Sequence, residues 1–301
     1  MFHFIINPTA SSGGSSSVWN QILKHLNDIP YEAHFTTNKN SAPAIAREIE
    51  NMNTEETIIV VGGDGTLNSV INGFKNPKKI TLGYIPAGSG NDFGRSLNIQ
   101  RTDSYIKKLL SGNKCINMDI GLLESHNQKH YFVVSSGIGC DADICTSDMT
   151  AKIKAFFNKL HIGSFSYVFS ALSRIFLYKT PTADVYVDGQ HLTVKNCYFS
   201  TIMNCCYEGG GIKFCPDADI SDGILNLCIV SRSNPLSLIT LLPLGYSGKH
   251  IGKKGVTTLK GKKITIRLSE ERPSHTDGEF FSKTNEITAS LAYKIRFLIT
   301  D

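Results

Sequence analysis

The chain has 301 residues, of which 41% are hydrophobic and 19% are charged, and its formal net charge is +5. This composition permits a sizeable core and excludes a disordered chain, and the length predicts two domains of roughly 100–200 residues each. The mild positive charge favours anionic partners only weakly.

The eight cysteines include no CxxC pair and no neighbouring histidine cluster, so their spacing excludes the common zinc motifs. We expect them to be mostly buried thiols in a reducing cytosol.

The longest apolar run, residues 236–244, is much shorter than the roughly 20 residues of a spanning helix. Residues 1–6 lack the features of a signal peptide. A cytoplasmic protein is therefore expected.

The first third of the chain alternates strand-like and helix-like segments. Strands are predicted at residues 2–6, 31–36, 57–61 and 80–85, and helices near residues 18–26, 42–50, 67–74 and 91–97. Ser41 is expected to cap the second of these helices. Strands that alternate with helices predict a parallel sheet covered on both faces, in a Rossmann-like three-layer α/β domain.

The pattern changes near Gly121. A helix is predicted at residues 164–178, and strands at residues 183–187, 197–203, 224–230, 263–268 and 293–299. These strands predict a second domain that is an antiparallel β-sandwich. We place the first domain at residues 1–121 and the second at 122–289, and expect residues 290–301 to return to the first domain.

A glycine-rich turn, Gly62-Gly63-Asp64-Gly65-Thr66, joins a predicted strand to a predicted helix. Its glycines let backbone N–H groups approach an anion, and the helix N-terminus adds a partial positive charge. The turn matches neither the Walker A loop nor the GxGxxG dinucleotide fingerprint. A phosphate site is predicted, although the spacing alone also fits a plain strand–helix turn. Asp64 would repel phosphates unless a cation such as Mg²⁺ lay between them.

A second turn of similar composition, Pro86-Ala87-Gly88-Ser89-Gly90-Asn91-Asp92, follows the next predicted strand. Asp92 by itself could be a helix N-cap. In an open parallel sheet, however, the two turns would lie at the same carboxyl edge, where ligands bind. Together they predict a phosphate-binding cleft.

These two turns, the second continuing into Phe93-Gly94-Arg95, resemble the diacylglycerol kinase catalytic family, which includes bacterial soluble diacylglycerol kinases, related lipid kinases and sphingosine kinases. The resemblance extends over the whole chain. It continues in Asn7-Pro8-Thr9, Met118-Asp119-Ile120-Gly121, Gly209-Gly210-Gly211 with Pro216 and Ala218, Asp222-Gly223-Ile224-Leu225, and Asp277-Gly278-Glu279. It implies a first domain like those of phosphofructokinase and NAD kinase, which would bind nucleotide, and a β-rich domain for a lipid substrate.

The resemblance also implies roles for individual residues. Glu279 would be the general base, with Asp64 as a second catalytic residue. ATP would contact Asn7, Pro8, Thr9, Ala10, Ser11, Thr37, Gly63, Asp64, Gly65, Thr66, Leu67, Asn68, Ser69, Ser89 and Asn91. A structural Mg²⁺ would be held by Asp219, Asp222 and the carbonyl of Ile224, and joined through water to Asp64, Asp92 and Asp119.

Four positions depart from the family pattern. Ser11 stands where glycine is common, so a different shape is expected for the first loop. Ser89 replaces a threonine and keeps the hydroxyl, and Gly94 replaces an alanine. Asn226 replaces a common aspartate, but Asp222 is retained, so the metal site is expected to survive.

Residues 224–269 contain no acidic residue. They contain eight cations: Arg232, Lys249, Lys253, Lys254, Lys260, Lys262, Lys263 and Arg267. With the apolar Leu241, Leu242, Leu244 and Tyr246, these cations could form a face that contacts an anionic membrane, or simply a solvated surface. No nucleic-acid-binding motif accompanies them, so no nucleic-acid partner is expected.

We interpret the chain as an ATP-dependent lipid kinase that phosphorylates diacylglycerol and contacts the inner face of the membrane peripherally. Alternatives are a kinase for a sphingoid base, phosphatidylglycerol or NAD, and a non-catalytic nucleotide- or lipid-binding regulator. The joint presence of Asp64, Asp222 and Glu279 argues against the regulator, which needs no base. A homodimer is compatible with the sequence, which leaves the oligomeric state open.

Overall fold

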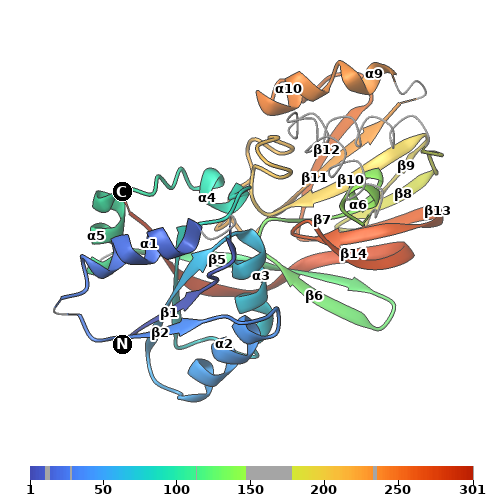
Figure 1. Ribbon diagram of the computed structural model, residues 1–301. Coiled ribbons are helices and arrows are strands. Elements are labelled where there is room, and N and C mark those ends of the chain that lie inside the picture. Colours follow the sequence, from blue (N-terminus) through green and yellow to red (C-terminus); the bar gives the residue numbers. More distant parts are fainter. Residues whose placement is uncertain (11–13, 28, 113, 147–177, 233–235, 301) are drawn as a thin grey trace.

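Four parallel strands form the sheet of the N-terminal domain in the computed structural model, which describes residues 1–10, 14–27, 29–112, 114–146, 178–232 and 236–300. Their order is β4-β3-β1-β2, so that β2 lies at the edge. Figure 1 shows β2 beside β1, with which it pairs. All four were predicted; β1, β3 and β4 are apolar runs, whereas β2 is partly polar and mostly exposed. The bounds are Phe2–Ile6 (β1), Tyr31–Phe35 (β2), Glu56–Gly62 (β3) and Ile80–Pro86 (β4).

Helices cover both faces of this sheet, as predicted. Alternate residues of each strand point to opposite faces. Phe4 and Ile6 pack with α1 (Gly14–Leu23) and α5 (Asp103–Ser111), whereas Ile5 packs with α2 (Ser41–Asn51) and α3 (Asp64–Gly73). The result is a three-layer α/β domain.

One predicted helix cap is wrong. Ser41 is the first residue of α2, and the cap position belongs to Asn40. The Ser41 hydroxyl instead accepts hydrogen bonds from the N–H groups of Thr37 and Asn38, at 3.2 and 3.1 Å. It therefore shapes the loop that leads from β2 into α2. The predicted helix near residues 91–97 is α4 (Asp92–Ser96), and Asn91 precedes it in the left-handed region at φ 52°.

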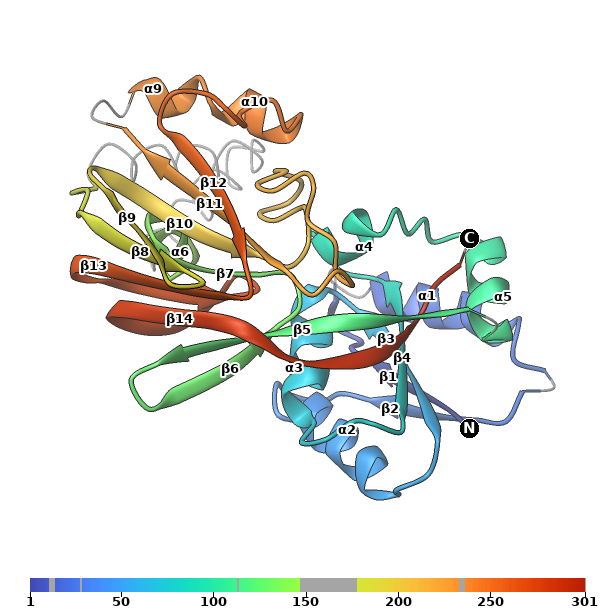
Figure 2. The same cartoon turned by 180° about the vertical axis from the view of Figure 1, so that it is seen from behind.

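Two long strands run through both domains: β5 (Cys115–Ser125) and β14 (Glu279–Leu298). Residues 115–124 of β5 pair antiparallel with residues 288–298 of β14, and Figure 2 shows the two strands lying side by side from one domain into the other. Near its end β14 also pairs in parallel with β4, where Phe297 lies opposite Leu82. The C-terminal segment thus returns to the first sheet, and Gly121 lies inside β5.

The second domain is an antiparallel sandwich. One layer contains β12, β11, β10 and β7, and the other contains β9 and β8 with parts of β13, β14, β5 and β6. The bounds are Gln128–Phe132 (β6), Ser135–Gly139 (β7), Ala183–Val187 (β8), Gln190–Val194 (β9), Cys197–Met203 (β10), Leu225–Ser231 (β11), Val256–Gly261 (β12) and Lys263–Thr276 (β13). Strand β13 joins the layers because it pairs with β8 in its first half and β7 in its last.

The sandwich core lies between these layers and is built of aliphatic side chains such as Ile202 of β10, Leu227 of β11 and Ile266 of β13. Short helices flank the domain: α6 (Cys140–Thr146), α9 (Leu236–Ile239) and α10 (Leu242–Tyr246). The helix predicted at residues 164–178 falls almost entirely outside the described residues. None of the helices within the described ranges is long and apolar enough to cross a bilayer.

Candidate active site

A cavity of about 470 Å³ lies at the carboxyl edge of the parallel sheet, next to the turn between β13 and β14. Both domains contribute to its wall. It is lined by Asn7, Ala10, Thr36, Asn38, Lys39, Ala42, Gly63, Asp64, Gly65, Thr66, Ser69, Gly88, Ser89, Gly90, Asp277 and Glu279. The two glycine-rich turns predicted as a phosphate site therefore open into one cavity.

The two turns touch through their glycines. A Cβ atom added to Gly88 would lie 2.5 Å from the Cα of Gly63, a distance at which the backbone would have to move. Gly63 is also the cap residue of α3, so the N–H groups of the first turn of that helix lie beside this contact. Backbone donors at a helix N-terminus form a ready anion site.

Asp64 holds the two turns together. Its Oδ2 accepts a hydrogen bond from the N–H of Asp92 at 2.8 Å, and its Oδ1 accepts from the N–H of Phe93 at 3.3 Å. Removal from water and, to a smaller extent, the nearby Asp92 carboxylate raise the pKa of Asp64 to about 6, against the effect of the two N–H donors. A neighbouring cation would therefore stabilise the ionised form of Asp64.

Asp92 joins the first domain to the second. It is buried, and its carboxylate accepts from the Arg95 guanidinium and, at 2.7 Å, from the N–H of Gly210. Gly210 lies in the left-handed region at φ 80°, which explains why glycine suits this loop. Asp92 is not the N-cap of α4, because Asn91 occupies that position.

Asn7 and Asn91 shape the loops around the cavity. The Asn7 amide donates to the Thr66 hydroxyl at 3.1 Å, and the side-chain oxygen of Asn7 accepts from the N–H of Thr9 at 3.1 Å. The Asn91 side chain accepts from the N–H of Gly88 at 2.9 Å and donates to its carbonyl at 2.7 Å. These two residues therefore fix the loops that line the cavity.

Asp277 anchors the turn that carries Glu279. Its carboxylate accepts hydrogen bonds of 2.7–2.9 Å from the Asn68 amide and from three consecutive N–H groups, those of residues 133–135. Desolvation raises the pKa of Asp277 by more than the four donors lower it, so the pKa lies above its ordinary value. Glu279 is exposed, and its Oε1 would lie 3.3 Å from a Cβ added to Gly65. A carboxylate from the second domain therefore faces the start of α3.

The structure brings most of the predicted ATP contacts to this cavity, but not all. Leu67 is fully buried in the core, and Asn68 is buried with its amide on Asp277. Asn91 and Thr9 act within the loops, and Thr37 is exposed beside Thr36 and Asn38, which line the cavity instead. Pro8 does not line the cavity, and Ser11 falls outside the described residues.

The predicted metal residues lie on a separate turn. Asp219 accepts from the N–H of Ser221 at 2.8 Å, and Asp222 accepts from the N–H of Ile224 at 2.9 Å. Asp119 is tied to the same turn, because its carboxylate accepts from the N–H of Gly223 at 2.8 Å. The carboxylate and carbonyl oxygens of this turn form the donor set that a hard cation such as Mg²⁺ prefers.

Lys294 of β14 occupies part of this region. Its ammonium lies 3.2 Å from the buried Asp119 carboxylate and donates to the Ser221 carbonyl at 2.9 Å. Asp119 therefore already has a positive partner, which the sequence interpretation did not foresee. Asp64 and Asp92 form a different hydrogen-bonded group, with the second turn and Gly210.

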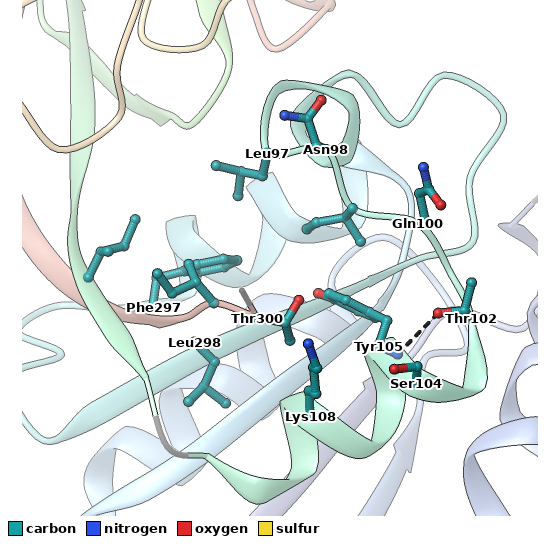
Figure 3. A pocket seen from close by; sticks show the side chains of 13 residues that line it. Leu97, Asn98, Gln100, Thr102, Ser104, Tyr105, Lys108, Phe297, Leu298 and Thr300 are labelled. Atoms are coloured by element: carbon teal, nitrogen blue, oxygen red, sulfur yellow. Dashed lines mark hydrogen bonds between the residues drawn. The ribbon is translucent and has the colours of Figure 1, made fainter.

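Several residues of the cavity were missed by the sequence interpretation. Lys39 and Asn38 follow β2 and carry no motif, and only their position at the sheet edge places them here. The anchoring role of Asp277 was also missed, although its motif was identified. A larger cavity of about 560 Å³ lies between residues 97–108 and the end of β14, with Tyr105 and Phe297 in its wall (Figure 3). None of the predicted site residues lines it.

Comparison with known proteins covers nearly the whole chain. Residues 1–123 match the family described as the diacylglycerol kinase catalytic domain. Residues 133–294 match the family described as the YegS C-terminal NAD kinase beta sandwich-like domain. The two matches divide the chain in the same order as the α/β domain and the sandwich.

Similar full-length proteins occur in Bacillus subtilis. The protein named "Putative lipid kinase YtlR" is 30% identical over 290 residues, which are 93% of this chain and 94% of the relative. A diacylglycerol kinase of the same organism is 28% identical, over 92% of this chain and 88% of that protein. The crystal structure of a diacylglycerol kinase from Bacillus anthracis covers 99% of this chain and 96% of its own, with 22% identity and a TM-score of 0.71, and supports the fold.

Proposed function

Because this chain belongs to the diacylglycerol kinase catalytic family, we propose that it transfers the γ-phosphate of ATP to the hydroxyl of diacylglycerol in the cavity between its two domains. The observation that carries this proposal is the position of Glu279, whose carboxylate lies across from Gly65 at the start of α3. A base and a phosphate-binding backbone thus face each other.

The nucleotide side of the reaction depends on the first domain. The N–H groups of the two glycine turns would neutralise the phosphates, and Ser69 and Ser89 add hydroxyls to the same wall. Phosphoryl transfer requires positioning and charge neutralisation more than covalent chemistry. The close approach of Gly63 and Gly88 serves that purpose, because it lets both turns reach one anion.

The acceptor side depends on the turn between β13 and β14. Glu279 would accept the proton of the lipid hydroxyl as the new O–P bond forms. Four donors fix Asp277, two residues earlier, and so hold the Glu279 backbone in place. An exposed carboxylate on a fixed turn can approach an acceptor that enters from outside.

Mg²⁺ would strengthen the contact between the domains. Asp219, Asp222 and the Ile224 carbonyl would hold it on the 219–224 turn, with Asp64, Asp92 and Asp119 connected through water. Within this network, Lys294 supplies part of the positive charge at Asp119.

The lipid would be taken from a membrane surface. Leu236, Tyr246 and Ile251 are exposed large apolar residues, and Lys249, Lys253 and Lys254 lie exposed beside them in the chain. We call these six residues the α10 surface. We propose that it contacts the anionic inner leaflet peripherally, and that no nucleic acid takes part.

The function is tested by offering labelled ATP and a panel of acceptors in mixed vesicles: diacylglycerol, a sphingoid base, phosphatidylglycerol and soluble NAD. We expect label in phosphatidic acid, dependent on Mg²⁺. Label in another product would identify a different member of the panel as the acceptor. ATP binding without transfer to any member of the panel would favour a regulator.

A further inference from the structure

Two histidines and a glutamate meet on the first sheet, away from the proposed active site. His3 lies on β1, and Glu32 and His34 lie on the edge strand β2. The parallel register places His3 opposite Glu32 and Ile5 opposite His34. Since strand side chains alternate between faces, all three side chains project from the same face of the sheet.

The spacing of their ligand atoms fits a metal ion. His3 Nδ1 lies 3.3 Å from His34 Nε2 and 3.5 Å from Glu32 Oε2, and the last two atoms are 3.7 Å apart. In a tetrahedral zinc site with bonds of about 2.0–2.1 Å, ligand atoms lie about 3.3 Å apart. We infer that His3, Glu32 and His34 form a binding site for a divalent transition metal, with Zn²⁺ as the ion that fits best.

A second carboxylate orients the buried ligand. His3 is fully buried, and its Nε2 lies 3.2 Å from Glu56 Oε2. Glu56 is itself fixed, because Oε1 accepts from the Thr54 hydroxyl at 2.7 Å. A carboxylate on one imidazole nitrogen holds the proton there and leaves the other nitrogen free to bind metal, an arrangement typical of zinc-binding histidines.

The other two ligands are accessible. The side chain of Glu32 is 48% exposed and that of His34 is 26% exposed, so an ion can reach the site from solvent and keep a water as its fourth ligand. His3 precedes the cavity residue Asn7 by four positions along the chain, about 13 Å of extended strand. The site is therefore distinct from the phosphate cleft, and a metal there would fasten β2 to β1.

The test uses the full chain with every affinity tag removed, because a polyhistidine tag binds the same ions. After chelation and dialysis, the protein is titrated with Zn²⁺ and, in parallel, with Co²⁺ as a spectroscopic probe. We expect one ion per chain and an intense Co²⁺ visible spectrum typical of tetrahedral coordination, without a thiolate charge-transfer band. A thiolate band, or less than one ion per chain, would overturn the inference.

Variants locate the ion. Glu56→Gln is expected to weaken Zn²⁺ binding about 10–100-fold, and His34→Gln and Glu32→Gln at least as much. The control, His191→Gln, removes another exposed histidine that lies beside a carboxylate, Asp184 at 2.9 Å, and should bind Zn²⁺ as the parent does. The thermal midpoint of each metal-free variant reports whether it is folded. Parent-like Zn²⁺ affinity in a folded His34→Gln protein would contradict the assignment.

Discussion

Asp277 and Glu279 lie two residues apart and serve different purposes, one holding the turn and the other facing the cavity. The distinction arises from hydrogen bonding: Asp277 receives four donors, whereas Glu279 is exposed. Behind this turn, the buried His275 lies 3.2 Å from Asp141 and 3.6 Å from Glu208. A single imidazole thus sits between two carboxylates directly below the Glu279 turn.

This histidine predicts a pH dependence of stability. Burial alone would lower the pKa of His275, but Glu208 and Asp141 outweigh burial and raise it to about 9, from an ordinary 6.5. The folded state therefore keeps a proton that the unfolded state loses. This proton contributes on the order of 3 kcal/mol to the free energy of unfolding, at about 1.4 kcal/mol per pKa unit. The contribution is complete below pH 6.5 and is lost as pH rises through 9.

Urea unfolding at several pH values checks this prediction. The comparison is made above pH 7, because burial raises the pKa of Glu208 to about 7 and its own titration lies mainly below that value. We expect His275→Gln to flatten the fall in unfolding free energy, while His191→Gln should keep it. An unchanged slope in His275→Gln would show that His275 is neutral in the folded protein.

At the scale of elements, the glycine turns after β3 and β4 act as one unit. In Gly88→Ala the new methyl group would meet the backbone of Gly63 at 2.5 Å, so the turns must separate. We expect a loss of about 1–3 kcal/mol in stability and weaker ATP binding.

Gly94→Ala is the matched control for Gly88→Ala. Its added Cβ would lie 3.4 Å or more from its neighbours, which is ordinary contact, and alanine favours the helix by roughly 0.5–1 kcal/mol. Chemical unfolding and a nucleotide-binding titration measure both variants. Equal ATP affinity in Gly88→Ala and Gly94→Ala would mean that the contact between the turns does not shape the nucleotide site.

The basic segment is less uniform than its sequence indicated. Arg267 pairs with Glu286 of β14 at 2.5 Å, so it does not lack a counter-charge. Leu241 is buried, Leu244 packs with the same core cluster, and the side chain of Leu242 lies outside the described set. Among the described side chains of this segment, the exposed large apolar residues are those of the α10 surface, because Leu238, Leu241 and Leu244 pack with the sandwich.

The α10 surface predicts binding to acidic vesicles. Each lysine near an anionic leaflet contributes about 1 kcal/mol, so Lys253→Glu with Lys254→Glu should lower vesicle partitioning by at least roughly tenfold. The charge-matched control is Lys24→Glu with Lys107→Glu, on exposed positions of the first domain. Sedimentation with acidic and neutral vesicles at low salt measures both. Equal loss in the two double variants would indicate a dependence on net charge alone.

For the whole molecule, the parallel half could be predicted from the sequence because three of its strands, β1, β3 and β4, are buried apolar runs. Strands β5, β6, β7, β9 and β12 were not predicted. The sequences of β6 and β9, QKHYF and QHLTV, are polar, and SSGIG of β7 resembles a loop. Strands β6 and β9 form hairpins with β5 and β8, whereas β7 pairs with β10 and β13, which lie far away in the chain. His3, Glu32 and His34 are likewise separated along the chain, and the register of β1 and β2 brings them together.

The phosphate turns could be predicted because their residues are consecutive, whereas the pairing of Asp119 with Lys294 joins positions 175 residues apart. The cavity itself depends on β5 and β14, which run through both domains and hold the Glu279 turn against α3. Strand β5 continues through Gly121, where the sequence pattern changes.

The transfer of phosphate from ATP to diacylglycerol by Glu279→Gln, compared with the parent chain, tests most directly whether the two domains form one catalytic site. The substitution keeps the shape of an exposed side chain and removes the base. We expect ATP binding to persist and turnover to fall by about 10²–10⁴-fold. Parent-like turnover in a Glu279→Gln protein that binds ATP normally would contradict the account.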